Sequence, residues 1–369
     1  MLIDSRDVCL TDWAGAEAVL GGAAAIDAVA FSTGAMRRRR DVRDGSQLFR
    51  LAMHYSVGGS SLRTTAAWSQ SVLGPDISDV ALLGRLRLAG DFLAELVARL
   101  LWVDRAPLER WDGPEIRLVD GCVFSGPGGG QHRLHAAFDP LRGRFTSFEL
   151  TDHRGAEKLT RADIQAGDVA VADRNYAKTW SLREIAEKQA FFVVRAGVSS
   201  MRMIDPESGE RLDAKAVLAA LGEKERVEIP ICVIESKGKK KGPGKKPPVP
   251  ARLVVTRASA AAARRETARV NRSKIQHKAT PRADTRAMAD VVMIVTNLPR
   301  ETWTLARVEQ LYRLRWQIEL AFKLLKSTFA MREVPANDPA LARSWILANL
   351  AAALLARRLA ASIEADFSP

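Results

Sequence analysis

The order of short apolar runs between residues 115 and 197 constrains the fold more than any other feature of the chain. Three runs rich in β-forming residues come first, EIRLVDG, RLHAAFDP and RFTSFELTD, and turns containing Gly or Pro separate them. After a connecting segment, GDVAVAD has the same character, NYAKTWSLREIAEKQA has a helical composition, and FFVVRAG has that of a buried strand. This order predicts an α/β domain in which an antiparallel meander precedes strands joined by crossovers.

Three strands, a crossover, a strand, a helix and another strand is the order typical of ribonuclease-H-like domains. We therefore predict an α/β fold with a ribonuclease-H-like core. Asp120 and Asp173 are predicted to end the first and fourth strands. Because α/β sheets place ligands at the crevice beside strand ends, both carboxylates are candidate site residues.

The stretch LYRLRWQIELAFKLLKS, residues 311–327, has no Pro or Gly and is predicted to form one helix with two faces. One face is an apolar stripe. The other carries a single carboxylate among cations and aromatic rings: Tyr312, Arg315, Trp316, Glu319, Lys323 and Lys326. An exposed helix with ordinary i,i+4 ion pairs is the simpler interpretation. However, solvated faces seldom place a Trp and a Tyr among their charges.

The charge balance points to a polyanionic partner. Lys and Arg number 56 and Asp and Glu number 43, so the net charge is 56 − 43 = +13. Nucleic acid is the usual partner of such a chain, because binding neutralises phosphates. A soluble protein that is merely basic is the alternative.

The same sequence favours a cytoplasmic location. Cys9, Cys122 and Cys232 are too far apart for a zinc site and do not form a disulfide framework, so a reducing compartment is expected. The N-terminus lacks the cations of a signal peptide, and the longest apolar run, residues 345–356, is too short to cross a bilayer. We predict no membrane association.

Residues 1–105 are predicted to form an all-helical domain. Leu51–Tyr55, a turn at Gly58 and Gly59, and the capped segment SSLRTTAAWSQ resemble a helix-turn-helix, although such turns are common in helical domains. Four consecutive arginines, Arg37–Arg40, come just before it. A DNA-binding domain is therefore our interpretation, and an ordinary helical domain with a solvated basic edge is the alternative.

The chain divides into four predicted segments: a helical DNA-end-binding domain (1–105), the first part of the ribonuclease-H-like core (106–197), a β-rich insertion (198–300), and the C-terminal part of the core with closing helices (301–369). Inside the insertion, KGKKKGPGKKPPVP must be a solvated loop. A helix near residues 260–277 would place Arg265, Arg269 and Arg272 on one side. Solubility and phosphate contact explain these two basic features equally well.

Asp120, Asp173 and Glu319 lie on three elements of one predicted domain. Carboxylates at close range raise one another's pKa unless cations neutralise them. Hard divalent ions such as Mg²⁺ take oxygen ligands, and two of them about 3.5–4 Å apart assist in-line phosphoryl transfer. The chain has 43 acidic residues, so this spacing alone is a weak signal.

A family resemblance strengthens the case for these three carboxylates as one site. Tyr312, Arg315, Glu319 and Lys326 match the Y-x2-R-x3-E-x6-K signature of bacterial DDE-type insertion-sequence transposases, in the branch called the insertion-sequence-four family. LVDG at Asp120 and ADRNY from residue 172 resemble the two aspartate motifs of that family, and a long β-rich insertion before the Glu is typical of it. The resemblance covers most of the chain.

The resemblance implies a DNA transposase with a ribonuclease-H-like catalytic core. Asp120, Asp173 and Glu319 would be catalytic and would bind two Mg²⁺ ions, with Mn²⁺ as a possible substitute. Water attack at an element end would free a 3′-hydroxyl, which would then attack target DNA. The partners would be double-stranded DNA, both terminal inverted repeats and target, and a second copy of the chain in a homodimer. The protein would be associated with the nucleoid.

The same resemblance assigns DNA-binding residues. Tyr312, Arg315 and Lys326 would hold phosphates around a hairpin intermediate, a task that suits a fork-shaped cation, a point charge and a stacking ring. Residues expected to assist in the same crevice are Lys323, Trp316, Arg174 and Tyr176.

Two details depart from the family or compete with it. The family usually has Thr or Ser two residues after the first Asp, where this chain has Cys122, a weaker hydrogen-bond donor. His132 and His135 could suggest a metal pair, but we favour a structural role because the acids already account for the metal.

Two rival functions remain at this point. One is a catalytically silent or domesticated relative that binds or nicks DNA without moving an element. The other is a basic binding protein, which would bind DNA without metal and would tolerate Asp120→Ala.

Overall fold

The computed structural model describes residues 13–74, 76–101, 113–125, 131–142, 144–152, 154–198, 200–235, 246–261, 263–264, 267–268, 288, 290–328, 334–336 and 338–366. Most of the Lys-Gly-Pro segment and the three arginines predicted on a helix near residues 260–277 lie outside these ranges.

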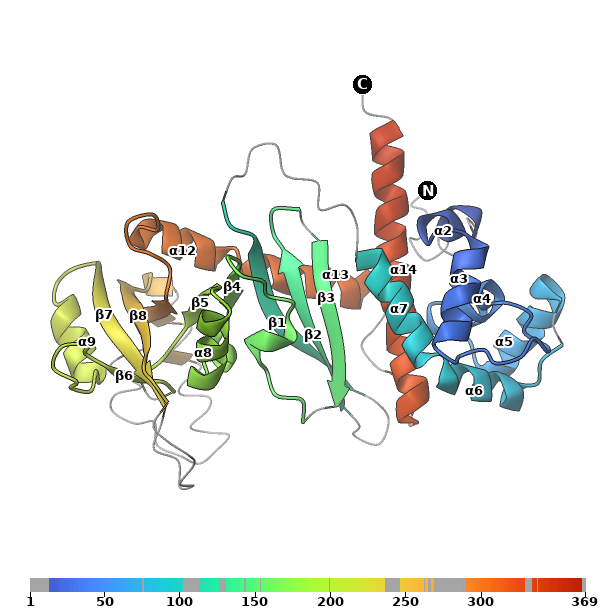
Figure 1. Ribbon diagram of the computed structural model, residues 1–369, viewed down its shortest axis with the longest axis horizontal. Helices are drawn as coiled ribbons and strands as arrows, with labels where there is room; N and C mark the ends of the chain where they lie inside the picture. Colours follow the sequence, from blue (N-terminus) through green and yellow to red (C-terminus); the bar gives the residue numbers. More distant parts are fainter. Residues whose placement is uncertain are drawn as a thin grey trace.

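A nine-stranded mixed sheet forms the centre of the molecule, in the order β3-β2-β1-β4-β5-β9-β8-β7-β6 (Figure 1). Its strands are β1 (Ile116–Ser125), β2 (Gln131–Asp139), β3 (Arg144–Asp152), β4 (Val169–Ala172), β5 (Phe191–Arg195), β6 (Arg202–Ile204), β7 (Arg226–Ile234), β8 (Val249–Arg257) and β9 (Val291–Thr296). β1, β2 and β3 form an antiparallel meander, β4 is parallel to β1, and β5 is parallel to β4. The predicted α/β class and strand order are confirmed, and they are consistent with a ribonuclease-H-like core.

The strands of residues 198–300 extend this sheet. β9 pairs with β5 in the antiparallel direction, and β8, β7 and β6 follow outward from it. The insertion therefore lies in the same sheet as the core, beyond β5, and it carries one further helix, α9 (Ala214–Leu221).

Helices cover both faces of the sheet. On one face, α8 (Thr179–Glu187) and α9 pack on the cluster that contains Val119 and Ala172. On the other, α12 (Leu305–Arg313), α13 (Trp316–Thr328) and α14 (Pro339–Asp366) pack on the cluster that contains Leu118 and Cys122. Because alternate residues of a strand point to opposite faces, β1 contributes to both layers.

Between Trp13 and Leu101 the regular elements that the structure describes are all helical. They are α2 (Trp13–Val19), α3 (Ala23–Ser32), α4 (Gly45–Ser56), α5 (Leu62–Trp68), the π-helix η1 (Ser69–Leu73), α6 (Asp79–Leu88) and α7 (Gly90–Leu101). Asp44, Ser61 and Ser78 cap three of them by accepting backbone N–H groups. The cap predicted for the segment SSLRTTAAWSQ is therefore confirmed, at Ser61.

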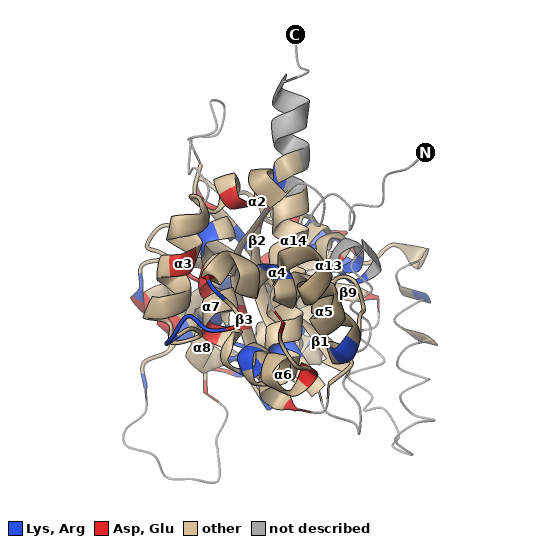
Figure 2. Ribbon diagram, turned by 90° about the vertical axis from the view of Figure 1, so that its right-hand side faces the viewer, with Lys and Arg blue, Asp and Glu red and all other residues tan. Residues whose placement is uncertain are grey.

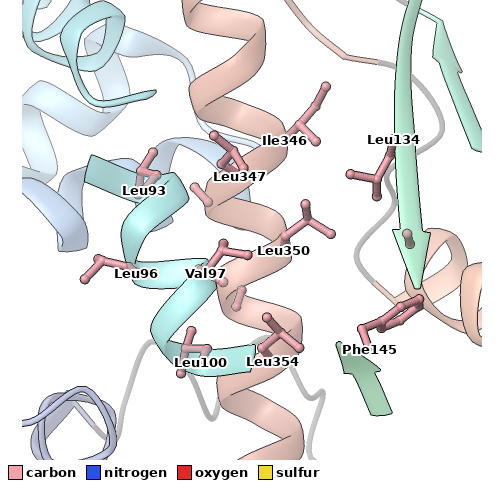
Figure 3. Packing of buried hydrophobic residues seen from close by; sticks show 14 of the residues in the cluster. Leu93, Leu96, Val97, Leu100, Leu134, Phe145, Ile346, Leu347, Leu350 and Leu354 are labelled. Atoms are coloured by element: carbon pink, nitrogen blue, oxygen red, sulfur yellow. The ribbon is translucent and has the colours of Figure 1, made fainter. Parts of the chain in front are cut away.

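α14 joins the helical region to the sheet (Figure 3). Leu347 of α14 points towards Leu93 and Val97 of α7, whereas Leu350 lies on the side of α14 that faces Leu134 of β2. Burying each such side chain contributes about 1.5–3 kcal/mol. Residues 339–356 are apolar enough to cross a membrane, but 67% of that window is buried inside the protein, as in a core helix.

The prediction of one helix over residues 311–327 is wrong. The chain ends α12 at Arg313, turns at Leu314 and Arg315, and starts α13 at Trp316. The N–H groups of Leu314 and Arg315 donate to carbonyls three residues back, at 3.1 Å, so the turn has 3₁₀ bonds instead of helical ones. The turn allows α12 to pack against β4 and β5 while α13 packs against β1.

Candidate active site

The register of the sheet brings the two aspartates together. Val119 of β1 pairs with Ala172, the last residue of β4, so Asp120 and Asp173 come next on neighbouring parallel strands. Asp173 follows the end of β4, as predicted. The prediction that Asp120 ends the first strand is wrong, because β1 continues to Ser125 by pairing with β2 after β4 has stopped. The end of β4 thus leaves Asp120 at a step in the sheet.

Each aspartate is oriented by its own backbone. An Asp173 carboxylate oxygen accepts the N–H of Asn175 at 2.8 Å and so caps the 3₁₀ turn η4 (Arg174–Tyr176). An Asp120 oxygen accepts the N–H of Gly121 at 2.8 Å. The pKa of Asp120 is raised to about 6, mainly by burial and also by the charges of Asp173 and Glu319, while the Gly121 hydrogen bond and the charge of Arg315 oppose the rise. Asp120 therefore lies in the field of both other predicted carboxylates.

Glu319 reaches this site from the first turn of α13. Its carboxylate pairs with the Arg315 guanidinium at 2.7 Å, and that guanidinium also lies 5.8 Å from the centre of the Tyr312 ring. The pKa of Tyr312 is raised by burial, while Arg315 and Arg195 lower it and Asp173 raises it. The break between α12 and α13 therefore leaves these signature residues beside the aspartates.

The remaining residues of α13 differ in exposure. The Lys326 ammonium donates to the Val123 carbonyl of β1 at 3.2 Å and lies 5.2 Å from the Phe124 ring centre. Lys323 is exposed, and Trp316 is 59% exposed. Lys326 is thus held against the catalytic strand, whereas Trp316 and Lys323 present themselves to solvent.

Of the two residues expected beside Asp173, only one faces the surface. Arg174 is partly exposed and its Nε lies 3.8 Å from where a side chain on Gly197 would begin. Tyr176 is 1% exposed and belongs to the core cluster on the α8 face of the sheet. A direct DNA contact by Tyr176 would require it to leave that core, so we do not carry this expectation further.

Arg195 is a neighbour of Asp173 that the sequence did not indicate. Val194 of β5 pairs with Ala172, which places Arg195 beside Asp173 at the same edge. The buried Nε of Arg195 has no hydrogen-bond partner within the described part of the chain. The run FFVVRAG does show a cation at the end of a buried strand. That this cation lies beside Asp173 follows only from the strand order.

The carboxylates do not yet form a metal cluster. Among the described residues, no three His, Cys, Asp or Glu side chains are grouped closely enough to hold a metal ion. Glu319 is turned towards Arg315, and Asp173 caps its turn. The donor set itself fits a hard divalent cation, because carboxylate oxygens are the ligands that such ions take and Asp120 lies in the field of Asp173 and Glu319. Such binding requires Glu319 to leave Arg315.

Comparison with known proteins identifies the family. The family described as "Transposase DDE domain" matches residues 111–355. The chain belongs to the DDE transposases. The putative transposase InsL for insertion sequence element IS186A of Escherichia coli (strain K12) is 38% identical over 347 residues, which are 93% of this chain and 92% of that protein. The transposase for insertion sequence element IS421 of Escherichia coli is 38% identical over 348 residues, with the same coverage.

A more distant relative is also named a transposase. The transposase for insertion sequence element IS231F of Bacillus thuringiensis subsp. israelensis is 23% identical over 247 residues, 58% of this chain and 50% of that protein. The family predicted from the motifs is thus confirmed, and so is the function: the chain is a DNA transposase, an enzyme of a family that uses divalent metal ions.

Proposed function

We propose that this transposase cuts an insertion sequence out of DNA and joins its 3′ ends to a target, with Asp120, Asp173 and Glu319 as the catalytic carboxylates. The observation that carries the proposal is the register of β1 and β4, which sets the two aspartates side by side within the field of Glu319. The 38% identity to insertion-sequence transposases over 93% of the chain supports the same activity.

The three carboxylates would hold two Mg²⁺ ions, or Mn²⁺ in their place. Bound divalent ions of this kind activate the attacking oxygen and stabilise the leaving oxygen of a phosphodiester. Hydrolysis breaks the bond between phosphorus and the 3′-oxygen of the element strand, which leaves as a 3′-hydroxyl. That hydroxyl then attacks a phosphodiester of the target and displaces its 3′-oxygen.

The cations beside the acids would position the DNA. Arg315 is free to fork onto phosphate oxygens once Glu319 has left it. Arg195 and Arg174 line the same edge beyond Asp173. From the α12–α13 side, the contacts would come from Tyr312, Trp316, Lys323 and Lys326, of which Trp316 is the most exposed ring.

The helical region of residues 13–101 is the proposed reader of the terminal inverted repeats. Figure 2 looks onto this region, with α3, α4, α5 and α6 facing the reader. The helix formed by α5 and η1 exposes Arg63, Thr64, Ala67 and Gln70, none of them acidic, and buries Thr65 and Ser69. Arg and Gln are the side chains that read guanine and adenine in the major groove. Arg37–Arg40 are all exposed and would contact phosphates.

A binding measurement tests that face. Arg63→Ala is expected to weaken binding to the element end by about 1–3 kcal/mol and to reduce the preference over scrambled DNA. Arg85→Ala, on α6, should weaken binding to the element end and to scrambled DNA by the same factor, or leave both unchanged. Equal losses from both variants would show that the α5 face does not read sequence.

Two further proposals follow from the reaction. Both ends of an element must be held together, so we propose that a homodimer acts in the synaptic complex. Binding to chromosomal DNA would associate the protein with the nucleoid. The rival is a catalytically silent or domesticated relative that only binds DNA.

The deciding experiment is strand cleavage and transfer on labelled DNA that carries both element ends, with Mg²⁺. Glu319→Gln should reduce cleavage by about 100-fold or more, because it removes a ligand charge worth several kcal/mol in the transition state. Binding to the ends should persist, and Glu223→Gln, an exposed carboxylate after α9, should cut normally. A wild-type protein that binds the ends with Mg²⁺ but never cuts them would favour the silent relative.

A further inference from the structure

Tyr176 lies behind the catalytic strand, and no step of the reaction above uses it. Its ring is packed into the core with Val119 and Ala172, and the whole residue is 1% exposed. Its hydroxyl is buried and has no hydrogen-bond partner among the residues that the structure describes. A buried hydroxyl without a partner costs stability, so its retention calls for a reason.

The hydroxyl is aimed at the backbone of Gly121. A Cβ atom built on Gly121 would lie 3.3 Å from the Tyr176 oxygen, a tighter contact than most real Cβ atoms make. The next atoms, the Leu134 carbonyl oxygen at 3.6 Å and a Glu157 oxygen at 3.8 Å, are at ordinary distances. Glycine at this position therefore leaves the space beside the strand that the phenol oxygen occupies.

The phenol remains protonated in this place. Burial raises the pKa of Tyr176, and the nearby negative charges of Asp120, Glu157 and Asp173 raise it further. The contact with the strand is thus that of a neutral hydroxyl at any pH where the protein works.

Tyr176 connects the two aspartate motifs through the back of the sheet. It ends the 3₁₀ turn that Asp173 caps, and its N–H lies 3.3 Å from the Asp173 carbonyl oxygen. At its other end the hydroxyl lies 3.3 Å from where a Cβ atom on Gly121 would be, and the Gly121 N–H is bonded to the Asp120 carboxylate at 2.8 Å. A shift of the phenol would therefore move Asp120 relative to Asp173.

We propose that Tyr176 is a positioning residue, whose hydroxyl beside Gly121 fixes the separation of Asp120 and Asp173 so that both can bind the same metal ions. This role rests on the metal site of the proposed function. It explains why Tyr176 is buried on the face opposite the DNA. It also provides support for Asp120 that Cys122, on the other face of β1, is poorly suited to give.

The test is a double-mutant cycle with Mn²⁺ as the probe, measured by calorimetry on the full chain without DNA. Gly121→Ala should lower Mn²⁺ affinity by about 10- to 100-fold, the usual cost of disturbing residues behind metal ligands. Tyr176→Phe should lower it less, because the ring still packs. Gly121→Ala combined with Tyr176→Phe should recover to the level of Tyr176→Phe, because the oxygen that the methyl meets is gone.

Two controls separate positioning from loss of fold. Gly84→Ala, in α6, places a methyl where nothing lies within 4 Å and should leave Mn²⁺ affinity unchanged. Melting temperatures measured with EDTA should show all variants folded, and only the metal affinity should follow the cycle. A loss of affinity that merely tracks the melting temperature would mean a structural role alone and would overturn the proposal.

The outcomes distinguish this proposal from the metal site on which it rests. If Glu319→Gln reduces Mn²⁺ binding but Gly121→Ala does not, the site is right and the positioning role is wrong. A double variant as weak as Gly121→Ala alone would also overturn it, because the methyl would then act through another neighbour. If Glu319→Gln leaves Mn²⁺ binding unchanged, the metal site itself is wrong and both proposals fall.

Discussion

His135 lies in the core behind the catalytic strand, and its surroundings indicate a structural role. It pairs across the sheet with Gly121, is buried, and its Nε2 lies 3.0 Å from the Thr151 hydroxyl. Burial, together with the charges of Arg161 and Arg133, lowers the pKa of His135 to about 4. The structural role expected for this histidine agrees with a neutral ring in the core behind the catalytic strand.

This ring makes the protein sensitive to acid. In the unfolded chain a histidine takes up its proton near pH 6.5, whereas folded His135 does so only near pH 4. Between these values the unfolded state binds more protons, so the free energy of unfolding falls as the pH is lowered. Asp120, whose pKa is raised, acts in the opposite direction over a similar range.

His135→Gln should remove this part of the acid sensitivity. Between pH 7.5 and pH 4.5, we expect the variant to lose less unfolding free energy than the wild type, by about 1–2 kcal/mol. The size of the His135 pKa shift on folding limits this difference. Urea denaturation of both proteins at the two pH values measures it, and the contribution of Asp120 cancels in the difference. An identical pH dependence would mean that folding does not lower the pKa of His135.

The site residues that could be predicted were those with a fixed place in a local motif. Glu319 and Arg315 are four residues apart in the sequence and remain paired at 2.7 Å even though the helix breaks just before Trp316. Tyr176 and Arg195 could not be assigned in this way. The face of the sheet on which Tyr176 lies and the residue beside Arg195 both depend on the strand register. Sequence spacing carries no information about either.

At the scale of elements, the break between α12 and α13 is where local propensity fails. Nothing in residues 311–327 disfavours a continuous helix, since the residues are good helix formers without Pro or Gly. The turn at Leu314 and Arg315 is imposed by packing on β4 and β5 at one end and on β1 at the other. The strands, in contrast, were predictable because each is a short run bounded by turn residues.

α12 is tied to the extended sheet by a buried arginine. Arg252 of β8 donates to the Leu298 carbonyl at 3.0 Å, to Glu228 at 2.7 Å, and to the Trp303 carbonyl just before α12. Its side chain is only 8% exposed. Glu228 also pairs with Arg300 at 3.1 Å, but the Arg300 side chain is 77% exposed. One carboxylate thus has a buried and an exposed partner.

This pair predicts two very different costs. Arg252→Ala should destabilise the protein by about 3–5 kcal/mol, because it leaves buried carbonyls and a carboxylate without their donor. Arg300→Ala should cost no more than about 0.5–1 kcal/mol, as an exposed ion pair does. Denaturant unfolding of the two variants gives the comparison. Similar losses from both would show that Arg252 does not anchor the start of α12.

At the scale of the whole molecule, α14 binds distant parts of the chain into one body. Arg343 pairs with Asp91 at 2.8 Å, and the Ser344 hydroxyl donates to the Leu86 carbonyl at 2.7 Å. The sequence predicted a mostly buried closing helix here, and the structure confirms it. It could not show that the helix packs on α7 and on the sheet together, since division by composition treats the two regions apart.

A shared core predicts shared unfolding. Leu350 is fully buried in the cluster that includes residues of α7, β2 and β3 (Figure 3). Leu350→Ala should cost about 2–5 kcal/mol through lost burial and the cavity that it leaves. Because both regions bury surface against α14, the loss should appear in one cooperative transition that tryptophan fluorescence and far-ultraviolet circular dichroism report at the same denaturant concentration.

Val80→Ala, at a position 75% exposed, should change stability by less than about 0.5 kcal/mol. Two separate transitions, only one of them shifted by Leu350→Ala, would instead show that the helical region unfolds independently of the catalytic sheet.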